Sequence, residues 1–323
     1  MASEKEIKNR IKSIKDTQKI TNAMYLISST KLRKAREQLE KAKPFSEQLG
    51  PCISALLGSE GKFNSPYFDD YVDPKGELHR KDRPKRKGYL VITADKGLAG
   101  AYNHNILKVA DAEITSLREE LEKHIAEGDD DSFHGKDPYK FYVVGELGRQ
   151  YFKSKGIKVS HHFLYTAQDP KLSRARAITH NVLPAFERGQ IDELYIIYTH
   201  MVNSVKEEAR IEKVLPLHKA EYMPLTTDEM DSEQPIYRIW PDADSVINQV
   251  MPNYVAGYVY CALVEAFACE QNARMTAMKA ANDSAADMLK SLNIEYNHIR
   301  QASITQEITE VIGGAKALKS KKK

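Results

Sequence analysis

The stretch Glu4–Lys43, EKEIKNRIKSIKDTQKITNAMYLISSTKLRKAREQLEKAK, decides how the fold begins. Neither glycine nor proline occurs before Pro44, so the opening segment predicts one helix of about 65 Å at 1.5 Å per residue. Steps of four and three residues along it trace the seam of a coiled coil, apolar at both ends and mostly polar or small from Gln18 to Ser28. The seam consists of Ile7, Ile11, Ile14, Gln18, Thr21, Tyr25, Ser28, Leu32, Ala35, Leu39 and Ala42.

The closing segment mirrors the opening one. No glycine or proline lies between Tyr258 and Ile312, which is enough for roughly 80 Å of helix before Gly313 and Gly314 weaken or end it. Near this end the same steps of four and three connect Ile304, Ile308, Val311, Ala315 and Leu318. We therefore expect the two ends of the chain to pack together as a long antiparallel coiled coil. Periodicity alone equally allows two helices of an ordinary bundle.

The middle of the chain has a different rhythm. Glycine, proline and the basic run Lys81–Lys87 predict a loop from Gly58 to Gly88. Short apolar segments then alternate with helical ones, which predicts an α/β fold: a Rossmann-like domain with a mostly parallel sheet and helices on its faces. The expected strands are 89–93, 140–144, 157–163 and 194–199, with an antiparallel edge strand at 210–217.

These patterns predict four parts of the chain. They are an N-terminal coiled-coil helix at 1–57, a loop at 58–88, the Rossmann-like domain at 89–241 and a C-terminal coiled-coil helix at 242–323.

Composition suits a protein without a membrane span. The 323 residues carry a net charge of +3, and no stretch reaches the roughly 18 apolar residues that a spanning helix needs. The first residues lack a secretory core, and the three cysteines (Cys52, Cys261, Cys269) show no C-x-x-C spacing, so we expect a reducing cytosol. Twelve Lys or Arg against five Asp or Glu before Pro44 suit an anionic partner or a solvated helix face.

Three kinds of chemistry lack their motifs. The turn Asp95–Asn103 after the first strand has neither G-x-G-x-x-G nor the P-loop spacing, so we expect no nucleotide cofactor. On a strand the rings of His161 and His162 point to opposite faces, so we expect no metal there. A nucleic-acid-binding function would use the basic N-terminal helix, which lacks aromatic interleaving. Neither nucleic-acid binding nor a dinucleotide enzyme is our first hypothesis.

The two terminal segments closely resemble the gamma subunit of F-type ATP synthases. The resemblance rests on EIKNRIKSIKDTQKITNAM from Glu6 to Met24, on ARMTAMKAA from Ala273 to Ala281, and on YNHIRQASITQEITEVIGG from Tyr296 to Gly314. It implies a non-catalytic rotor, the central stalk of a proton- or sodium-driven synthase. Its implied partners are three alpha and three beta subunits, an epsilon subunit and the membrane rotor ring of c subunits, with no nucleic acid. The implied location is the cytoplasmic face of the cell membrane, as a peripheral subunit.

The resemblance also implies contact residues. Those for the beta subunits are Met24, Lys96, Arg274, Arg300, Gln301 and Thr305, with Arg300, Gln301 and Thr305 as a polar catch on beta-subunit loops. Those for epsilon or the membrane ring are Asn203, Ser204, Tyr237, Trp240 and Asp242. This chain departs from the family at Lys96, Asn22 and His298, where a basic residue, usually Arg at the first position, is common. The loops 58–87 and 129–137 match the family poorly.

Overall fold

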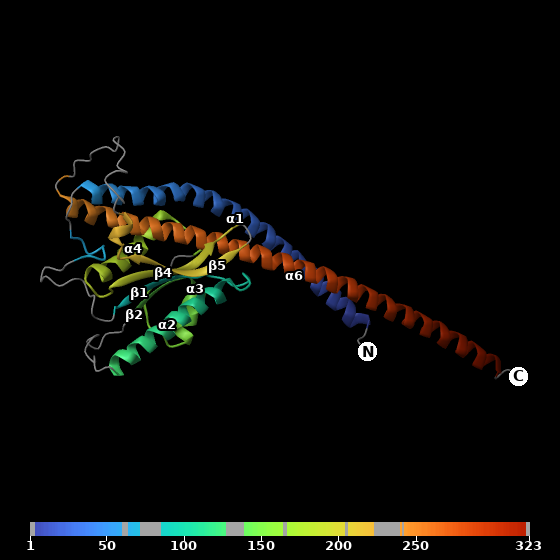
Figure 1. Ribbon diagram of the computed structural model, residues 1–323. Helices are drawn as coiled ribbons and strands as arrows, with labels where there is room; N and C mark the ends of the chain where they lie inside the picture. The colour runs from blue at the N-terminus through green and yellow to red at the C-terminus, as the bar shows by residue number, and fades with distance from the viewer. Residues whose placement is uncertain are drawn as a thin grey trace. The chain divides into compact units, whose positions relative to one another are not determined.

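The computed structural model describes residues 4–59, 64–71, 85–126, 139–163, 167–203, 206–222, 240 and 242–320. The chain forms two compact units, one of Met1–Ser29 with Arg274–Lys323 and one of Thr30–Ala273. Helices α1 (Glu4–Ser59) and α6 (Ala243–Ser320) contribute to both units (Figure 1). We call the first unit the shaft and the second the sheet domain. The four-part division expected from sequence stays a prediction.

The sheet domain contains five strands in the order β3-β2-β1-β4-β5. Strands β1 (Lys87–Ile92), β2 (Tyr139–Val144), β3 (Val159–Phe163) and β4 (Glu193–Met201) are parallel. Strand β5 (Glu207–Leu215) pairs antiparallel with β4, at the edge of the sheet. The predicted mostly parallel sheet with an antiparallel edge strand is therefore confirmed.

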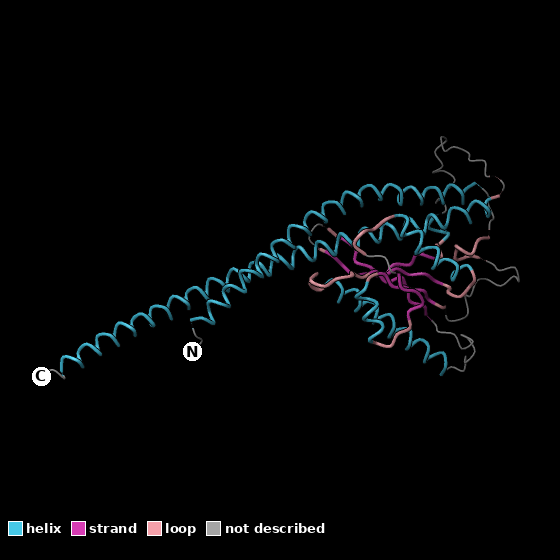
Figure 2. The backbone as a smooth tube through the Cα atoms, turned by 180° about the vertical axis from the view of Figure 1, so that it is seen from behind, coloured by secondary structure: helices cyan, strands magenta, loops and turns pink. Residues whose placement is uncertain are grey.

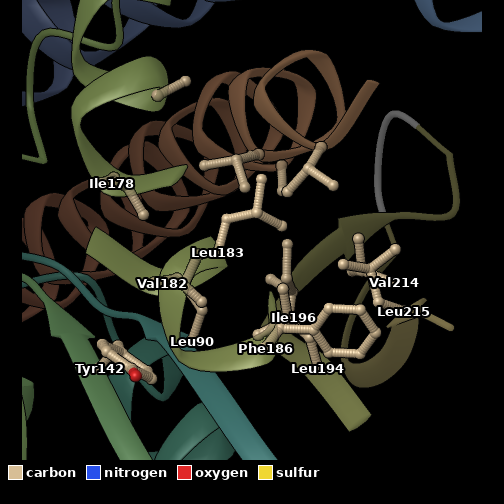
Figure 3. Close-up of a cluster of buried hydrophobic side chains, with 14 of the residues drawn as sticks. Leu90, Tyr142, Ile178, Val182, Leu183, Phe186, Leu194, Ile196, Val214 and Leu215 are labelled. Carbon is tan, nitrogen blue, oxygen red and sulfur yellow. The ribbon is translucent and has the colours of Figure 1, made fainter. Parts of the chain in front are cut away.

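Helices cover both faces of this sheet because its strands alternate their side chains. Tyr89 and Val91 of β1 join one core with α2 (Tyr102–Ala126) and α3 (Glu146–Ser154). Leu90 and Ile92 join the other core with α4 (Leu172–Glu187) and α6. Figure 3 shows side chains of the second core between strands and helices. Helix α5 (Lys219–Tyr222) is one short turn after β5.

One glycine sets the close approach of α3 to the sheet. Gly145 precedes α3 with φ of 95°, a left-handed conformation that L side chains rarely adopt. A Cβ atom there would lie 2.2 Å from the carbonyl oxygen of Thr93, so only glycine fits without movement of the chain. This turn places the start of α3 beside the end of β1.

Part of the expected loop 58–88 belongs to the core. Helix α1 ends at Ser59, and Tyr67 and Phe68 are buried in the same core as α4 and α6. Phe68 forms an isolated parallel bridge with Leu217, which fixes this segment against the end of β5. Residues 60–63 and 72–84 lie outside the described part of the chain.

Gly313 and Gly314 do not end the last helix. Helix α6 continues through both glycines to Ser320, so the expectation that they end it is wrong, whereas the expectation that they weaken it stays a prediction. Each glycine costs about 1 kcal/mol relative to alanine, whereas extending an existing helix adds a hydrogen bond per residue, so two glycines need not stop it. None of the described helices combines the length and apolarity that a membrane crossing requires.

We predict that the ion pair between Arg86 and Asp192 stabilises the sheet domain. Both side chains are largely buried, the Nε–Oδ2 distance is 3.2 Å, and the Arg86 backbone N–H also donates to Asp192. Asp192→Ala leaves the Arg86 charge uncompensated and should lower the free energy of unfolding by about 3 kcal/mol. Glu120→Ala, which removes the partner of Lys87 at 3.5 Å in an exposed pair, should cost less than about 1 kcal/mol. Urea titration of both variants checks this, and equal losses would contradict it.

Candidate functional site

The predicted seam of α1 is confirmed residue by residue. Every seam position from Ile7 to Ala42 is buried or half-buried, while most of the residues between them are exposed. Small buried residues, Thr21 and Ser28, occupy the middle of the seam. The seam therefore faces a partner along its whole length, and its middle admits close approach.

The seam of α6 lies one residue away from the predicted one. Within the shaft the buried and half-buried residues follow steps of four and three through Met278, Asn282, Ala285, Leu289, Leu292, Tyr296, Ile299 and Ser303. The prediction of Ile304, Ile308 and Val311 as seam residues is wrong, because all three are exposed, from 47% at Ile304 to 72% at Val311. A shift of one residue turns a side chain by about 100° around a helix. The predicted series is therefore a second apolar stripe.

Helix α6 extends past the start of α1. The Tyr296 hydroxyl donates to the Glu4 carboxylate at 3.2 Å, at the first described residue of α1. Helix α6 continues from there to Ser320, as Figure 2 also shows. All side chains from Ile304 to Gly314 are exposed. We call α6 from Asn297 onward the tip.

The expected polar catch lies on the tip, beside the second apolar stripe. Arg300, Gln301 and Thr305 are exposed, and the Thr305 hydroxyl donates to the Gln301 backbone carbonyl at 2.8 Å. Ile304 lies one turn after Arg300, and Ile308 one turn after Ile304, so the three polar residues border the apolar stripe. This face of the tip therefore offers a partner both hydrogen-bond donors and apolar surface.

On α1 the sequence reasoning missed residues beside Met24. Met24 is half-buried, and Ile20 and Ile27, four residues before and three after it, are 59% and 56% exposed. Spacings of four and three place these three side chains on one stripe. The sequence signal for this stripe was the presence of apolar residues outside the seam. A search for a single seam does not consider such residues.

The remaining expected beta-subunit contacts fall in different units. Arg274 is half-buried and begins the α6 part of the shaft. Lys96 is exposed in the sheet domain, in the turn after β1, next to exposed Leu98 with its φ of 64°. The structure brings Arg300, Gln301 and Thr305 onto one face of the shaft. Lys96 belongs to the other unit, the sheet domain.

The expected contacts with epsilon or the membrane ring separate into two places. The turn that contains Asn203 follows Met201, whose backbone N–H donates to Glu265 of α6 at 3.1 Å. Trp240 instead precedes the first residue of α6, and it is 86% exposed. The 22 helical steps from Ala243 to Glu265 span about 33 Å, so Asn203 and Trp240 do not form one patch. Ser204 and Tyr237 lie outside the described residues.

Asp242 has a local structural role. Its carboxylate accepts hydrogen bonds from the Ser245 backbone N–H at 2.8 Å and from the Ser245 hydroxyl at 2.9 Å. These bonds, the backbone one first, lower the pKa of Asp242 and cap the start of α6.

A carboxylate lies where a dinucleotide-binding sheet would hold phosphate. Asp95, at the end of β1, accepts the backbone N–H of Glu146 at 3.2 Å and of Ala167 at 2.7 Å. The N–H group at the start of α3 is thus bound to an anion of the protein itself, and a second anion would be repelled. Asp95 therefore ties the turn after β1 to the start of α3 and to Ala167.

The two histidines of β3 differ in their surroundings. His161 is exposed and its ring lies 4.6 Å from that of Phe163, measured between centroids. Burial, followed by the charge of Arg149, lowers the pKa of half-buried His162. No group of His, Cys, Asp and Glu in the described parts of the chain is arranged to hold a metal ion.

A paired-helix shaft with an uncovered apolar tip, joined to a sheet domain, defines a stalk subunit of a larger assembly. The family model described as ATP synthase matches residues 3–318. The chain is 42% identical to the ATP synthase gamma chain of Acetivibrio thermocellus, over 99% of this chain and 100% of that one. It is 40% identical to that of Ruminiclostridium cellulolyticum, over 97% and 98%.

A solved structure has the same fold. It is a chain of the Euglena gracilis mitochondrial ATP synthase, in a cryo-EM structure of OSCP, F1 and c-ring, with a TM-score of 0.61 and 15% identity over 99% of this chain and 96% of that one. From the family model and the relatives, the chain belongs to the ATP synthase gamma chains. It is thus a non-catalytic stalk subunit of a rotary ATP synthase, and its partners are other subunits of that complex.

We predict that Leu289, and not its exposed neighbour Ile294, holds the shaft together. Leu289 is 9% exposed in a unit that contains only segments of α1 and α6, so α1 must cover it, whereas Ile294 is 54% exposed. Leu289→Ala should weaken the pairing by about 2 kcal/mol and Ile294→Ala by no more than about 0.5 kcal/mol. Hydrogen exchange of the α1 amides in each full-length variant measures the difference. Faster exchange in Ile294→Ala than in Leu289→Ala would refute the observed seam.

Proposed function

We propose that this chain is the central rotor of a proton- or sodium-driven F-type ATP synthase, with its shaft inside a ring of three alpha and three beta subunits. Ion flow through the membrane ring of c subunits turns the chain, and the turning shaft drives ATP synthesis at the beta subunits. The observation that carries this proposal is the tip of α6, which is uncovered by α1 and has an exposed apolar stripe bordered by Arg300, Gln301 and Thr305.

The tip has the chemistry of a segment that is covered in the complex. A large apolar side chain gains about 1.5–3 kcal/mol when it is fully buried, and Ile304, Ile308, Val311 and Ile312 are all exposed in this chain. Contiguous exposed apolar surface marks an interaction site. A cavity formed by other subunits would surround the single helix of the tip and thereby bury this stripe.

The polar residues beside the stripe suit a switching contact. The planar Arg300 guanidinium can hold a carboxylate on a beta-subunit loop through two parallel hydrogen bonds. Because α1 and α6 present different side chains around the shaft, each rotation angle gives each beta subunit a different set of contacts. Contacts that differ between states shift the population of open and closed catalytic sites.

Met24, Ile20 and Ile27 supply a second face of the shaft. Methionine has flexible bonds and a polarisable sulfur, and so adapts to changing neighbours. A stripe of this kind can slide against successive beta subunits without a fixed hydrogen bond. We also propose contacts of Arg274 and Lys96 with acidic beta-subunit loops, since both carry the opposite charge.

The two separated surfaces of the sheet domain suggest two partners. We propose that Trp240 and the start of α6, which follows it, contact the membrane ring, because an exposed tryptophan is typical of an interface. The turn at Asn203, about 33 Å along α6, is then the epsilon contact. We also propose that the chain lies at the cytoplasmic face of the membrane, as a peripheral subunit.

Reconstitution tests the rotor proposal. The full-length chain mixed with cognate alpha and beta subunits should form a stable complex whose ATPase activity exceeds that of alpha and beta alone and whose central chain rotates. Single-molecule observation of a probe on the sheet domain detects rotation. A failure to assemble, or salt-dependent DNA binding or dinucleotide binding by the free chain, would favour the other functions.

We predict that Arg300→Ala with Gln301→Ala weakens coupling and leaves the free chain folded. Both side chains are exposed, so the free energy of unfolding should change by no more than about 0.5 kcal/mol. Loss of charge-assisted hydrogen bonds to the beta subunits, each about 1.5–3 kcal/mol, should lower ATP synthesis in membrane vesicles at least about tenfold. Arg118→Ala, an exposed arginine on α2, is the control and should synthesise ATP normally. Normal synthesis by the double variant would remove the catch from the mechanism.

A further inference from the structure

Helix α6 is tied to the sheet domain by hydrogen bonds along its length, in addition to its apolar face. The Tyr254 and Tyr258 hydroxyls bind the Tyr222 hydroxyl and the Glu212 carboxylate, respectively. Further along, Glu265 accepts the Met201 N–H, and the Ala266 carbonyl accepts the Tyr102 hydroxyl at 3.0 Å. The next tie is from Asn272 of α6, whose amide donates to Glu207 of β5 at 2.6 Å.

The tie between Asn272 and Glu207 has a particular position. Asn272 is buried, and the helix enters the shaft two residues later, at Arg274. Glu207 is the first residue of the edge strand β5, which also binds α6 through Glu212 and Tyr258. Any torque that passes between the sheet domain and the shaft through α6 must cross this point.

A glutamate at position 207 lowers the stability of the fold when it is ionised. Its burial raises the pKa of its carboxyl group, although the hydrogen bond from Asn272 opposes the shift. Cys269 of α6 and Tyr102 of α2 lie close enough for the Glu207 charge to act on them, and both are buried. A raised folded-state pKa contributes stability below the unfolded-state pKa, and this contribution is lost as pH rises through the folded-state pKa. The ionised form therefore destabilises the fold at neutral and alkaline pH.

A glutamine at this half-buried position would have nearly the same shape and would accept the same hydrogen bond without a charge. What the carboxylate adds is strength and direction, because a hydrogen bond to an ionised acceptor is shorter and about twice as strong as a neutral one. A residue that lowers stability while it strengthens one contact is typical of a functional position.

We propose that the Glu207 carboxylate and the Asn272 amide form the pin that transmits torque between the sheet domain and the shaft. This proposal rests on the rotor function proposed above. Glu207 and Asn272 are positioning residues, since they act on the catalytic sites of other subunits only through the angle of the shaft.

The test compares torsional stiffness with stability. The full-length chain is assembled with alpha and beta subunits. It carries Cys52→Ser, and Ser116→Cys at an exposed position of α2 holds an optical probe. The width of the angular distribution during pauses in rotation reports how stiffly the sheet domain is connected to the held shaft. Glu207→Gln should broaden the angular variance about twofold, since a neutral bond has about half the strength, and Asn272→Ala should broaden it further. Glu208→Gln, which removes the neighbouring exposed carboxylate, is the matched control and should leave the width unchanged.

Unfolding of the free chain in urea at pH 8 gives the second readout. Glu207→Gln should be as stable as the unchanged chain or more stable, because it removes a charge from a half-buried position. Val214→Ala, which creates a cavity in the sheet core at a buried position, should be less stable with an unchanged angular width. Unchanged widths in both pin variants, or broadening by Val214→Ala as large as theirs, would overturn the pin. A complex of the unchanged chain that does not rotate would overturn the rotor function instead.

Discussion

The structure depends on the burial of the apolar surface of α6 by a succession of different partners. A helix of 78 residues cannot cover its own apolar surface, so each part of it needs a neighbour. Its first part packs on the sheet through Ile247, Met251 and Val255, and its next part packs on α1 through Met278 and Leu289. The tip has no such neighbour among the described residues of the chain, although its apolar residues continue. The same helix thus serves as a core element, as half of a helix pair and as an exposed binding segment.

In the sheet domain, the carboxyl edge of a Rossmann-like frame is bonded by a side chain of the chain itself. Its strand order and its turns place helix starts at the carboxyl edge of the parallel strands, where related folds bind phosphate. Here the Asp95 carboxylate satisfies the N–H of Glu146 from within the chain. At the other edge of the sheet, the buried pair of Arg86 and Asp192 ties the start of β1 to the start of β4. What the frame provides is a rigid body with α6 attached to one face.

Sequence periodicity predicted most of this fold because burial imposes it. The seam of α1 could be located at every position, since that helix has one buried stripe, and the five strands could be located from their apolar runs and the turns between them. The α6 seam was placed one residue away because the exposed apolar residues of the tip follow the same steps of four and three, and periodicity cannot say whether such a stripe is covered in the isolated chain. Tyr67 and Phe68 escaped notice since their burial depends on a contact with Leu217, far along the sequence. Likewise, the separation of Asn203 from Trp240 follows from the length of α6, which no local pattern contains.

The site itself combines local and distant information in unequal parts. Arg300, Gln301 and Thr305 share a face through helix geometry, so sequence spacing was sufficient to group them. Ile20 and Ile27 could be recognised only once the seam had been shown to lie elsewhere on α1. The contact between Glu207 and Asn272 joins residues 65 positions apart, and its cost to stability is visible only from its burial. A rotor must stay stiff where its helix leaves the sheet domain and must remain adaptable at its tip, and the two requirements explain a half-buried carboxylate at one place and exposed isoleucines at the other.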